Sequence, residues 1–121
     1  MKKFLSAVAL SGTAQSQDHA RGYDAYEAGD YATALQEWRP LAEQGNEYAQ
    51  YGIGLLYHSG QGVPQDFEVA HMWSNIASAN GLEVAPEFRD RAAQRLTPQD
   101  ITTAQAMASE CMSSNYQNCG Y

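Results

Sequence analysis

Apolar residues between positions 49 and 81 recur at intervals of three and four, which is the spacing of one face of an α-helix. The pattern predicts two short amphipathic helices. Their apolar faces are formed by Ala49, Ile53, Leu56 and Tyr57 in the first helix and by Phe67, Ala70, Trp73, Ile76 and Ala77 in the second. The loop of residues 60–65 contains two glycines and a proline and should end the first helix, and Asp66 is suited to cap the second. Small residues such as Gly52 and Gly54 allow the two helices to approach each other closely.

A similar pair of helices is predicted before this one, over residues 18–29 and 30–45. The second helices of the two pairs match at an offset of 36 positions and the first helices at an offset of 31, because residues 61–65 are an insertion. Corresponding positions of the second helices are Asp30 and Asp66, Ala34 and Ala70, and Gly45 and Gly81. An internal repeat of this length is typical of a helical solenoid. Pro40 lies inside one of these helices and is expected to kink it or to remove a hydrogen bond locally.

A third pair of helices is predicted over residues 83–96 and 97–112. The second of them begins with Thr-Pro-Gln-Asp, which combines a capping residue, a proline at the first helical position and an acidic residue in the first turn. Residues 113–121 are polar and are expected to be irregular. The pattern therefore predicts an all-α solenoid over residues 18–112, followed by a C-terminal tail.

The first 14 residues have the pattern of an export signal. Lys2 and Lys3 precede an apolar run over residues 4–10, and small residues follow at positions 12–14, where a signal peptidase would cleave. The alternative is a disordered N-terminus with a few apolar residues. We expect residues 1–14 to be a signal peptide and the protein to be periplasmic or secreted. Its removal would leave five basic and 14 acidic residues and change the formal charge from −7 to −9.

Cys111 and Cys119 are the two cysteines of the chain. In an exported protein they are expected to form a disulfide that ties the tail to the last helix. The C-x-x-C spacing of a redox pair is absent, and a zinc site would need further ligands at a suitable spacing.

The stretch of residues 49–81 resembles the Sel-one-like repeat, a relative of the tetratricopeptide repeat. The matching positions are Ala49, Gly54, Tyr57, Gly60, Gly62, Val63, Asp66, Ala70, Trp73, Ala77 and Gly81. The sequence departs from the family pattern at Ile53, where the family has leucine, and at Ser78, where it has alanine. The resemblance extends over residues 22–112. It implies a right-handed superhelix of two to three helix pairs and a scaffold that binds other proteins.

The surface of such a solenoid is the strongest functional indication. The resemblance places the first helix of each pair on the concave side, where tyrosines combine apolar area with a polar tip. The predicted protein-binding residues are Tyr23, Glu27, Tyr48, Tyr51 and Leu55. The alternative is that some of these tyrosines pack between neighbouring helices. Trp38 and Trp73 are expected in the core.

The acidic charge is informative about partners. It argues against nucleic acid, which favours a basic face, and suits a basic protein partner. The longest apolar run is far shorter than the roughly 20 residues of a transmembrane helix.

Catalytic and ligand-binding patterns are weak throughout the sequence. His58 and Ser59 are neighbours on one helix end, which does not make a nucleophile and base. Glu68 and His71 are three residues apart and are interpreted as a surface pair. The histidines show no metal-binding spacing, and the Gly-x-Gly turn at residue 60 lacks the lysine of a phosphate loop. We therefore expect no enzymatic activity, no cofactor and no bound metal.

Three functions follow from the sequence and from the resemblance. The first is an exported scaffold that binds a partner protein, such as an adaptor of an envelope complex. The second is an inhibitor or immunity-type protein that neutralises a secreted toxin or hydrolase, which the acidic charge would suit. The third is a hydrolase, because β-lactamase-like activity has been proposed for cysteine-rich relatives. Those relatives carry a cysteine pair in each repeat, and this chain does not.

Overall fold

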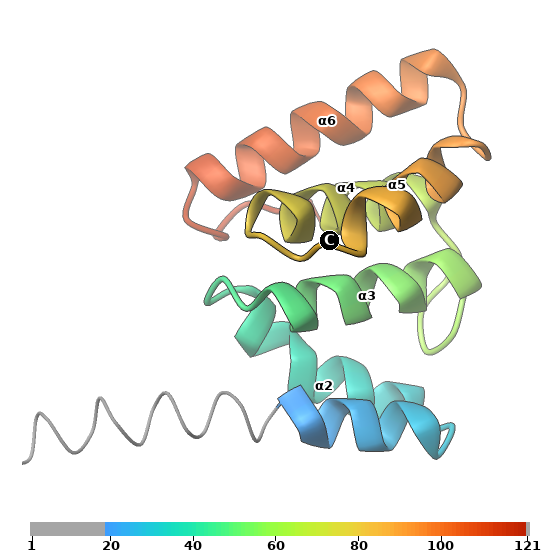
Figure 1. Ribbon diagram of the computed structural model, residues 1–121, viewed down its shortest axis with the longest axis vertical. Coiled ribbons are helices and arrows are strands. Elements are labelled where there is room, and N and C mark those ends of the chain that lie inside the picture. The colour runs from blue at the N-terminus through green and yellow to red at the C-terminus, as the bar shows by residue number, and fades with distance from the viewer. Residues whose placement is uncertain (1–18, 121) are drawn as a thin grey trace, which may run out of the picture.

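The helices follow one another along the long axis of the molecule in a computed structural model that describes residues 19–120. A helix over residues 19–27 is followed by α2 (Tyr31–Ala42), α3 (Glu47–Ser59), α4 (Phe67–Ala79), α5 (Ala85–Ala93) and α6 (Pro98–Ser113). Figure 1 shows this progression from the N-terminal helix at one end to α6 at the other. α2 packs on α3 and α3 on α4, and α4 contacts both α5 and α6. The all-α prediction is confirmed for the described residues, and the predicted signal peptide lies outside them.

Side-chain caps set the helix boundaries that the sequence predicts. The Asp66 carboxylate accepts hydrogen bonds from the N–H groups of Glu68 and Val69, at 3.0 and 3.1 Å. Gly60 ends α3 in the left-handed conformation, with a φ of 69°. At the start of α6, the Thr97 hydroxyl accepts from the N–H of Asp100, and the Asp100 carboxylate accepts from the N–H of Thr97. These interactions satisfy backbone donors that a helix N-terminus leaves unpaired.

The third helix pair begins with a shorter helix than the sequence predicts. α5 spans Ala85–Ala93 instead of residues 83–96. Its end tightens into a turn, because the N–H groups of Arg95 and Leu96 donate to carbonyls only three residues back, at 3.0 Å each. In α2, Pro40 lies in the last helical turn, and the helix ends two residues later.

The predicted apolar faces form the core. Trp73, Ile53, Leu56 and Ile76 are fully buried, and Trp38 is 2% exposed, so both tryptophans lie in the core as expected. Phe67 is an exception, because it is the first residue of α4 and is only partly buried. Its ring contacts the His58 ring and lies 4.7 Å from the Arg95 guanidinium carbon.

The two glycines of α3 face different neighbours, which corrects one expectation. A Cβ on Gly54 would lie 3.1 Å from the Ser74 hydroxyl, so Gly54 does allow α3 to approach α4. A Cβ on Gly52 would instead lie 2.6 Å from the Trp38 ring. Gly52 therefore makes room for the Trp38 indole of α2. It does not serve the close approach of α3 to α4.

The burial of His71 shows that the prediction of a surface pair with Glu68 is wrong. It lies within α4 and is only 3% exposed. Its Nδ1 makes no hydrogen bond within the part of the chain that the structure describes. Burial, together with the nearby Arg89 guanidinium, lowers the pKa of His71 below its usual range, against the opposing effect of Asp90. The side chain is a buried neutral histidine.

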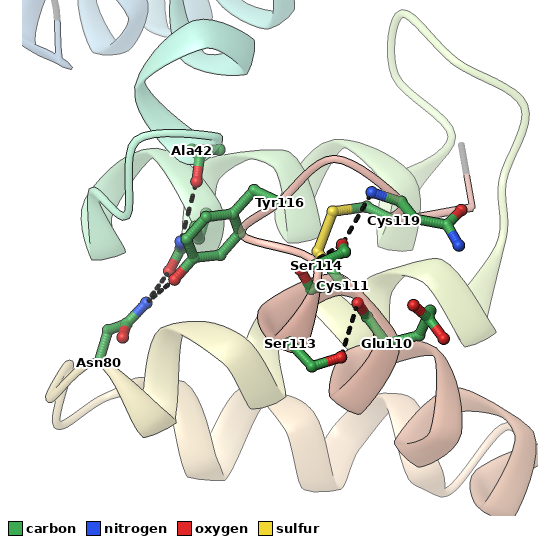
Figure 2. The surroundings of a disulfide bond; sticks show 10 residues. Ala42, Asn80, Glu110, Cys111, Ser113, Ser114, Tyr116 and Cys119 are labelled. Atoms are coloured by element: carbon green, nitrogen blue, oxygen red, sulfur yellow. Dashed lines mark hydrogen bonds between the residues drawn. A yellow bond between two sulfur atoms is a disulfide. The ribbon is translucent and has the colours of Figure 1, made fainter.

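The C-terminal tail is irregular, as predicted, but it is held in place. The Cys111–Cys119 disulfide is present and joins the tail to α6. Figure 2 shows Tyr116 between Ala42, at the end of α2, and Asn80, which follows α4. The amide of Asn80 donates to the Tyr116 hydroxyl at 3.1 Å and to the Gln50 carbonyl oxygen at 2.9 Å. Gln50 is fully buried and donates to the carbonyl of Ala42 at 3.0 Å.

Candidate functional site

A hollow of about 530 Å³, which we term the aromatic groove, lies between the N-terminal helix, α3 and the turn before α5. Its walls are formed by Tyr23 and Tyr26 of the N-terminal helix, Tyr48, Tyr51 and Leu55 of α3, and Val84 of the turn. Four of the five residues predicted to bind protein therefore lie in one groove. The fifth, Glu27, is exposed and lies one turn beyond Tyr23, outside the residues that line the groove.

Helical spacing explains why α3 presents these side chains together. Tyr48, Tyr51 and Leu55 follow one another at intervals of three and four residues, so they share a face beside the buried stripe. On the N-terminal helix, His19, Tyr23 and Tyr26 are likewise spaced by four and three residues, and they also line the groove. Arg21 is two residues from both His19 and Tyr23, which places it on another side of that helix.

The large hydrophobic side chains that are exposed among the described residues gather at this groove. Three large hydrophobic residues are exposed, namely Tyr23 at 49%, Tyr48 at 51% and Val84 at 55%. All three line the groove. An exposed apolar cluster rimmed by polar residues is a mark of an interaction surface.

Tyr51 packs against a neighbouring helix and is also partly exposed in the groove. It is half-buried, and its ring meets the Phe88 ring edge-on with centroids 5.4 Å apart. Leu55 is also half-buried. The alternative that some of the tyrosines pack between helices therefore applies in part to Tyr51. It also applies in part to Tyr48, which is 51% exposed but whose ring lies 4.8 Å from the His19 ring of the N-terminal helix.

The base of the groove is the indole of Trp38. Its N–H donates to the carbonyl of His19 at 3.2 Å, and Gly22 and Gly52 allow the ring to lie against two helices. The indole is thus fixed by α2, α3 and the N-terminal helix together. We expected Trp38 in the core but did not predict this role. The signal available in the sequence was Gly52, a small residue in the middle of an otherwise aromatic face.

Val84 and Leu82 were also missed, because they come from the turn between α4 and α5. No helical periodicity extends into that turn. Tyr26 could have been found, since it lies three residues after Tyr23 on the same helix.

The described residues that line the groove include no Asp, Glu, Lys or Arg. The His19 ring lies 4.8 Å from the Tyr48 ring, and burial lowers the pKa of His19 against the opposing effect of Glu47. Burial is also the main cause of a raised pKa at Tyr26, followed by its neighbours Tyr31 and Glu27. Both rings are therefore neutral near pH 7. Carboxylates stand beside the lining residues in the sequence, at Glu27, Glu47 and Glu83.

This arrangement can bind by apolar contact, ring stacking and hydroxyl hydrogen bonds. Among residues 19–120, no three His, Cys, Asp or Glu side chains lie close enough together to hold a metal ion. No helix over the same residues is both long and apolar enough to cross a lipid bilayer.

Comparison with known proteins gives one partial similarity. No family model matches the chain, and no solved structure matches it. The chain is 34% identical over 67 residues to a protein of Rhizobium leguminosarum bv. viciae named as an exopolysaccharide production negative regulator. The similar segment covers 54% of this chain and 25% of that protein. The chain thus matches about a quarter of the length of this curated relative.

Proposed function

We propose that this protein is an exported, non-enzymatic scaffold that binds a partner protein in the aromatic groove. The observation that carries the proposal is the gathering of Tyr23, Tyr48 and Val84, the exposed large hydrophobic residues of the described chain, around one hollow. Tyrosines are favoured at protein interfaces because they bury a large area at a low cost in side-chain entropy. The fixed base at Trp38 reduces the reorganisation that binding would require.

The proposal includes a short right-handed solenoid of Sel-one-like helix pairs, with the groove on its concave side. Matching turns support it. After α2 the N–H of Asn46 donates to the carbonyl of Leu41, and after α4 the N–H of Leu82 donates to that of Ala77, both at 3.0 Å and 36 positions apart. The first helices end alike at an offset of 31, through bonds from Asp30 to Ala25 and from Gln61 to Leu56, at 2.8 and 3.0 Å.

Export is supported by the disulfide, because such bonds persist in oxidising compartments. Cys111 and Cys119 are 0% and 5% exposed, so the bond is a buried part of the fold. The mass of the protein purified from its source tests this part of the proposal. We expect a chain that lacks about the first 14 residues and has no free thiol. A chain that begins at Met1 with two free thiols would contradict export.

The partner we propose is a protein with a basic surface, and not a nucleic acid, because the formal charge of the chain is −7. A regulatory role is supported by the name of the relative, an exopolysaccharide production negative regulator. In this view the groove holds a partner of an envelope system and controls what that partner does.

Quantitative affinity capture from the envelope fraction of the source tests the binding role. We compare the unaltered protein with a Tyr23→Ala/Tyr48→Ala variant and with Gln105→Ala, an exposed control on α6. Truncation of exposed tyrosines should leave the helical circular dichroism spectrum unchanged. We expect a partner that is captured by the unaltered protein and by Gln105→Ala but lost from the double variant. Equal capture by all three folded proteins would contradict a role for the groove.

A further inference from the structure

The walls of the aromatic groove limit how an occupant can be held. They are mainly helical, and the backbone N–H and C=O groups within a helix bond to one another. A partner therefore cannot join the groove as an added β-strand, which needs an exposed sheet edge. Any hydrogen bonds to the occupant must come mainly from side chains.

The side chains at the mouth of the groove are suited to a chain that presents free carbonyl groups. Tyr23, Tyr48 and Tyr51 bring hydroxyl groups that can donate, whereas the Trp38 N–H already donates to the carbonyl of His19. A helical occupant has few free carbonyls, because its own N–H groups use them. An extended segment presents its carbonyls along its whole length.

Proline residues would avoid the main cost of binding an extended segment, which is the burial of unpaired N–H groups. An ordinary peptide would carry N–H groups into a mainly apolar groove, and each one left without an acceptor would cost about 1–3 kcal/mol. Proline has no N–H group, and its ring presents a flat apolar surface to aromatic rings. Aromatic-lined grooves are a recurring way to bind polyproline II segments, which lose little entropy on binding because they are already extended.

Carboxylates next to the lining residues add a second requirement. Glu47 acts electrostatically on His19, which lines the groove, and Glu83 precedes the exposed Val84. In the adjoining hollow, which Tyr51 and Val84 share, the Arg91 guanidinium pairs with Glu87 at 3.4 Å. Among residues 19–120, Glu47 and Glu83 form no ion pair, so the charge beside this edge of the groove is acidic and would attract a cationic side chain next to the apolar segment.

We propose that the occupant of the aromatic groove is an extended, proline-rich segment of the partner protein with a lysine or arginine beside the prolines. This inference rests on the proposed function, because it names the chemistry of the partner at the same groove. Tyr23 and Tyr48 stack on the proline rings, their hydroxyls donate to the segment's carbonyls, and the carboxylates of Glu47 and Glu83 face its basic residue.

Fluorescence anisotropy with synthetic labelled peptides tests this inference on the full mature chain. The probe is a peptide of repeated Lys-Pro-Pro triplets. Matched probes are repeated Lys-Ala-Ala triplets, which keep the charge and favour a helix, and repeated Glu-Pro-Pro triplets, which keep the prolines. We expect the Lys-Pro-Pro peptide to bind at least about tenfold more tightly than either. Tyr48→Ala should weaken its binding about tenfold, and Gln105→Ala should not change it.

Other results would overturn the inference. Equal or tighter binding of the Lys-Ala-Ala peptide would indicate a helical or simply basic occupant. Binding of a linear glucan oligosaccharide that Tyr48→Ala abolishes, without binding of Lys-Pro-Pro, would indicate a sugar site. If affinity capture of a partner depends on Tyr48 but Lys-Pro-Pro fails to bind at about 1 mM, the inference fails and the proposed function stands. If capture does not depend on the groove either, both fail.

Discussion

Trp38 illustrates how single residues build both the core and the candidate site. Its ring is 2% exposed, lies against Gly22 and Gly52, and forms the base of the aromatic groove. A larger residue at either glycine would have to displace an indole that also holds the N-terminal helix through the carbonyl of His19. Packing and the shape of the groove are therefore set by the same few contacts.

Substitution of the two glycines of α3 should have unequal effects. In Gly52→Ala the new methyl group would overlap the Trp38 ring, which should lower the free energy of unfolding by about 1–3 kcal/mol. In Gly54→Ala the contact with the Ser74 hydroxyl is milder, and the better helix propensity of alanine offsets it by up to about 1 kcal/mol. Urea denaturation of both variants measures the difference. Equal stabilities would mean that the Trp38 contact is not as tight as described.

His71 should make stability depend on pH. Its pKa is lowered in the folded protein by burial and by Arg89, while the unfolded chain keeps a value near 6.5. The unfolded state therefore binds more protons below about pH 6.5, so the stability that neutral His71 allows is fully present above that pH and is lost as the pH falls toward the folded pKa.

Urea titrations at several pH values between about 7.5 and 5 test this effect. The His71→Gln variant isolates the contribution of His71 from those of His19 and His58, whose pKa values are also lowered by burial. We expect the fall in unfolding free energy on acidification to be smaller in the variant than in the unaltered protein. Parallel curves would show that His71 does not titrate between the folded and unfolded states in this range.

At the scale of the helix, capping geometry determines how firmly each element begins. Asp66 accepts two backbone hydrogen bonds at the start of α4, whereas Asp30 accepts one, at 3.3 Å, at the start of α2. The two residues occupy corresponding positions of the sequence pattern but are unequal in the structure.

Alanine substitution of the two caps should reveal this difference. Loss of an N-cap side chain costs about 0.5–2 kcal/mol, and we expect Asp66→Ala to lie near the upper end and Asp30→Ala near the lower end of that range. Chemical denaturation, with the helical content of each folded variant as a control, provides the measurement. A larger loss for Asp30→Ala would contradict the cap geometry.

The helices and most of the groove could be predicted because they depend on local signals. Asp66, Gly60 and Thr97 mark helix ends by interactions within a few residues, and the spacing of Tyr48, Tyr51 and Leu55 places them on one face. The end of α5 and the position of Val84 depend on how a turn packs against other helices. The burial of His71 depends on the chain around α4, and no pattern in the sequence separates it from a surface histidine.

The C-terminal tail connects parts of the fold that are distant in the sequence. The disulfide holds the tail to α6, and the Tyr116 hydroxyl accepts from Asn80, which also donates to the buried Gln50 of α3 (Figure 2). Asn115 and Tyr116 have positive φ angles of 57° and 64°, which are uncommon for residues other than glycine. The tail is therefore kept in this path by its contacts at both ends.

The losses of stability caused by removing these contacts should be less than additive. A Cys111→Ala/Cys119→Ala variant should lose about 2–3 kcal/mol of stability, as expected for a short disulfide loop. Tyr116→Phe should lose about 1 kcal/mol, for one hydrogen bond. Since both changes release the same tail, the triple variant should lose less than the sum. Thermal or urea unfolding of all three variants tests this, and strict additivity would show that the tail does not couple the two contacts.

We propose that this protein binds another protein through the aromatic groove. Site-specific photo-crosslinking in living cells of the source tests it most directly, with a photoreactive phenylalanine analogue at position 48 and, as a control, at position 105 of α6. We expect a discrete crosslinked protein species from position 48 and none from position 105. Crosslinks from position 105 alone, or from neither position in an abundant folded protein, would contradict it.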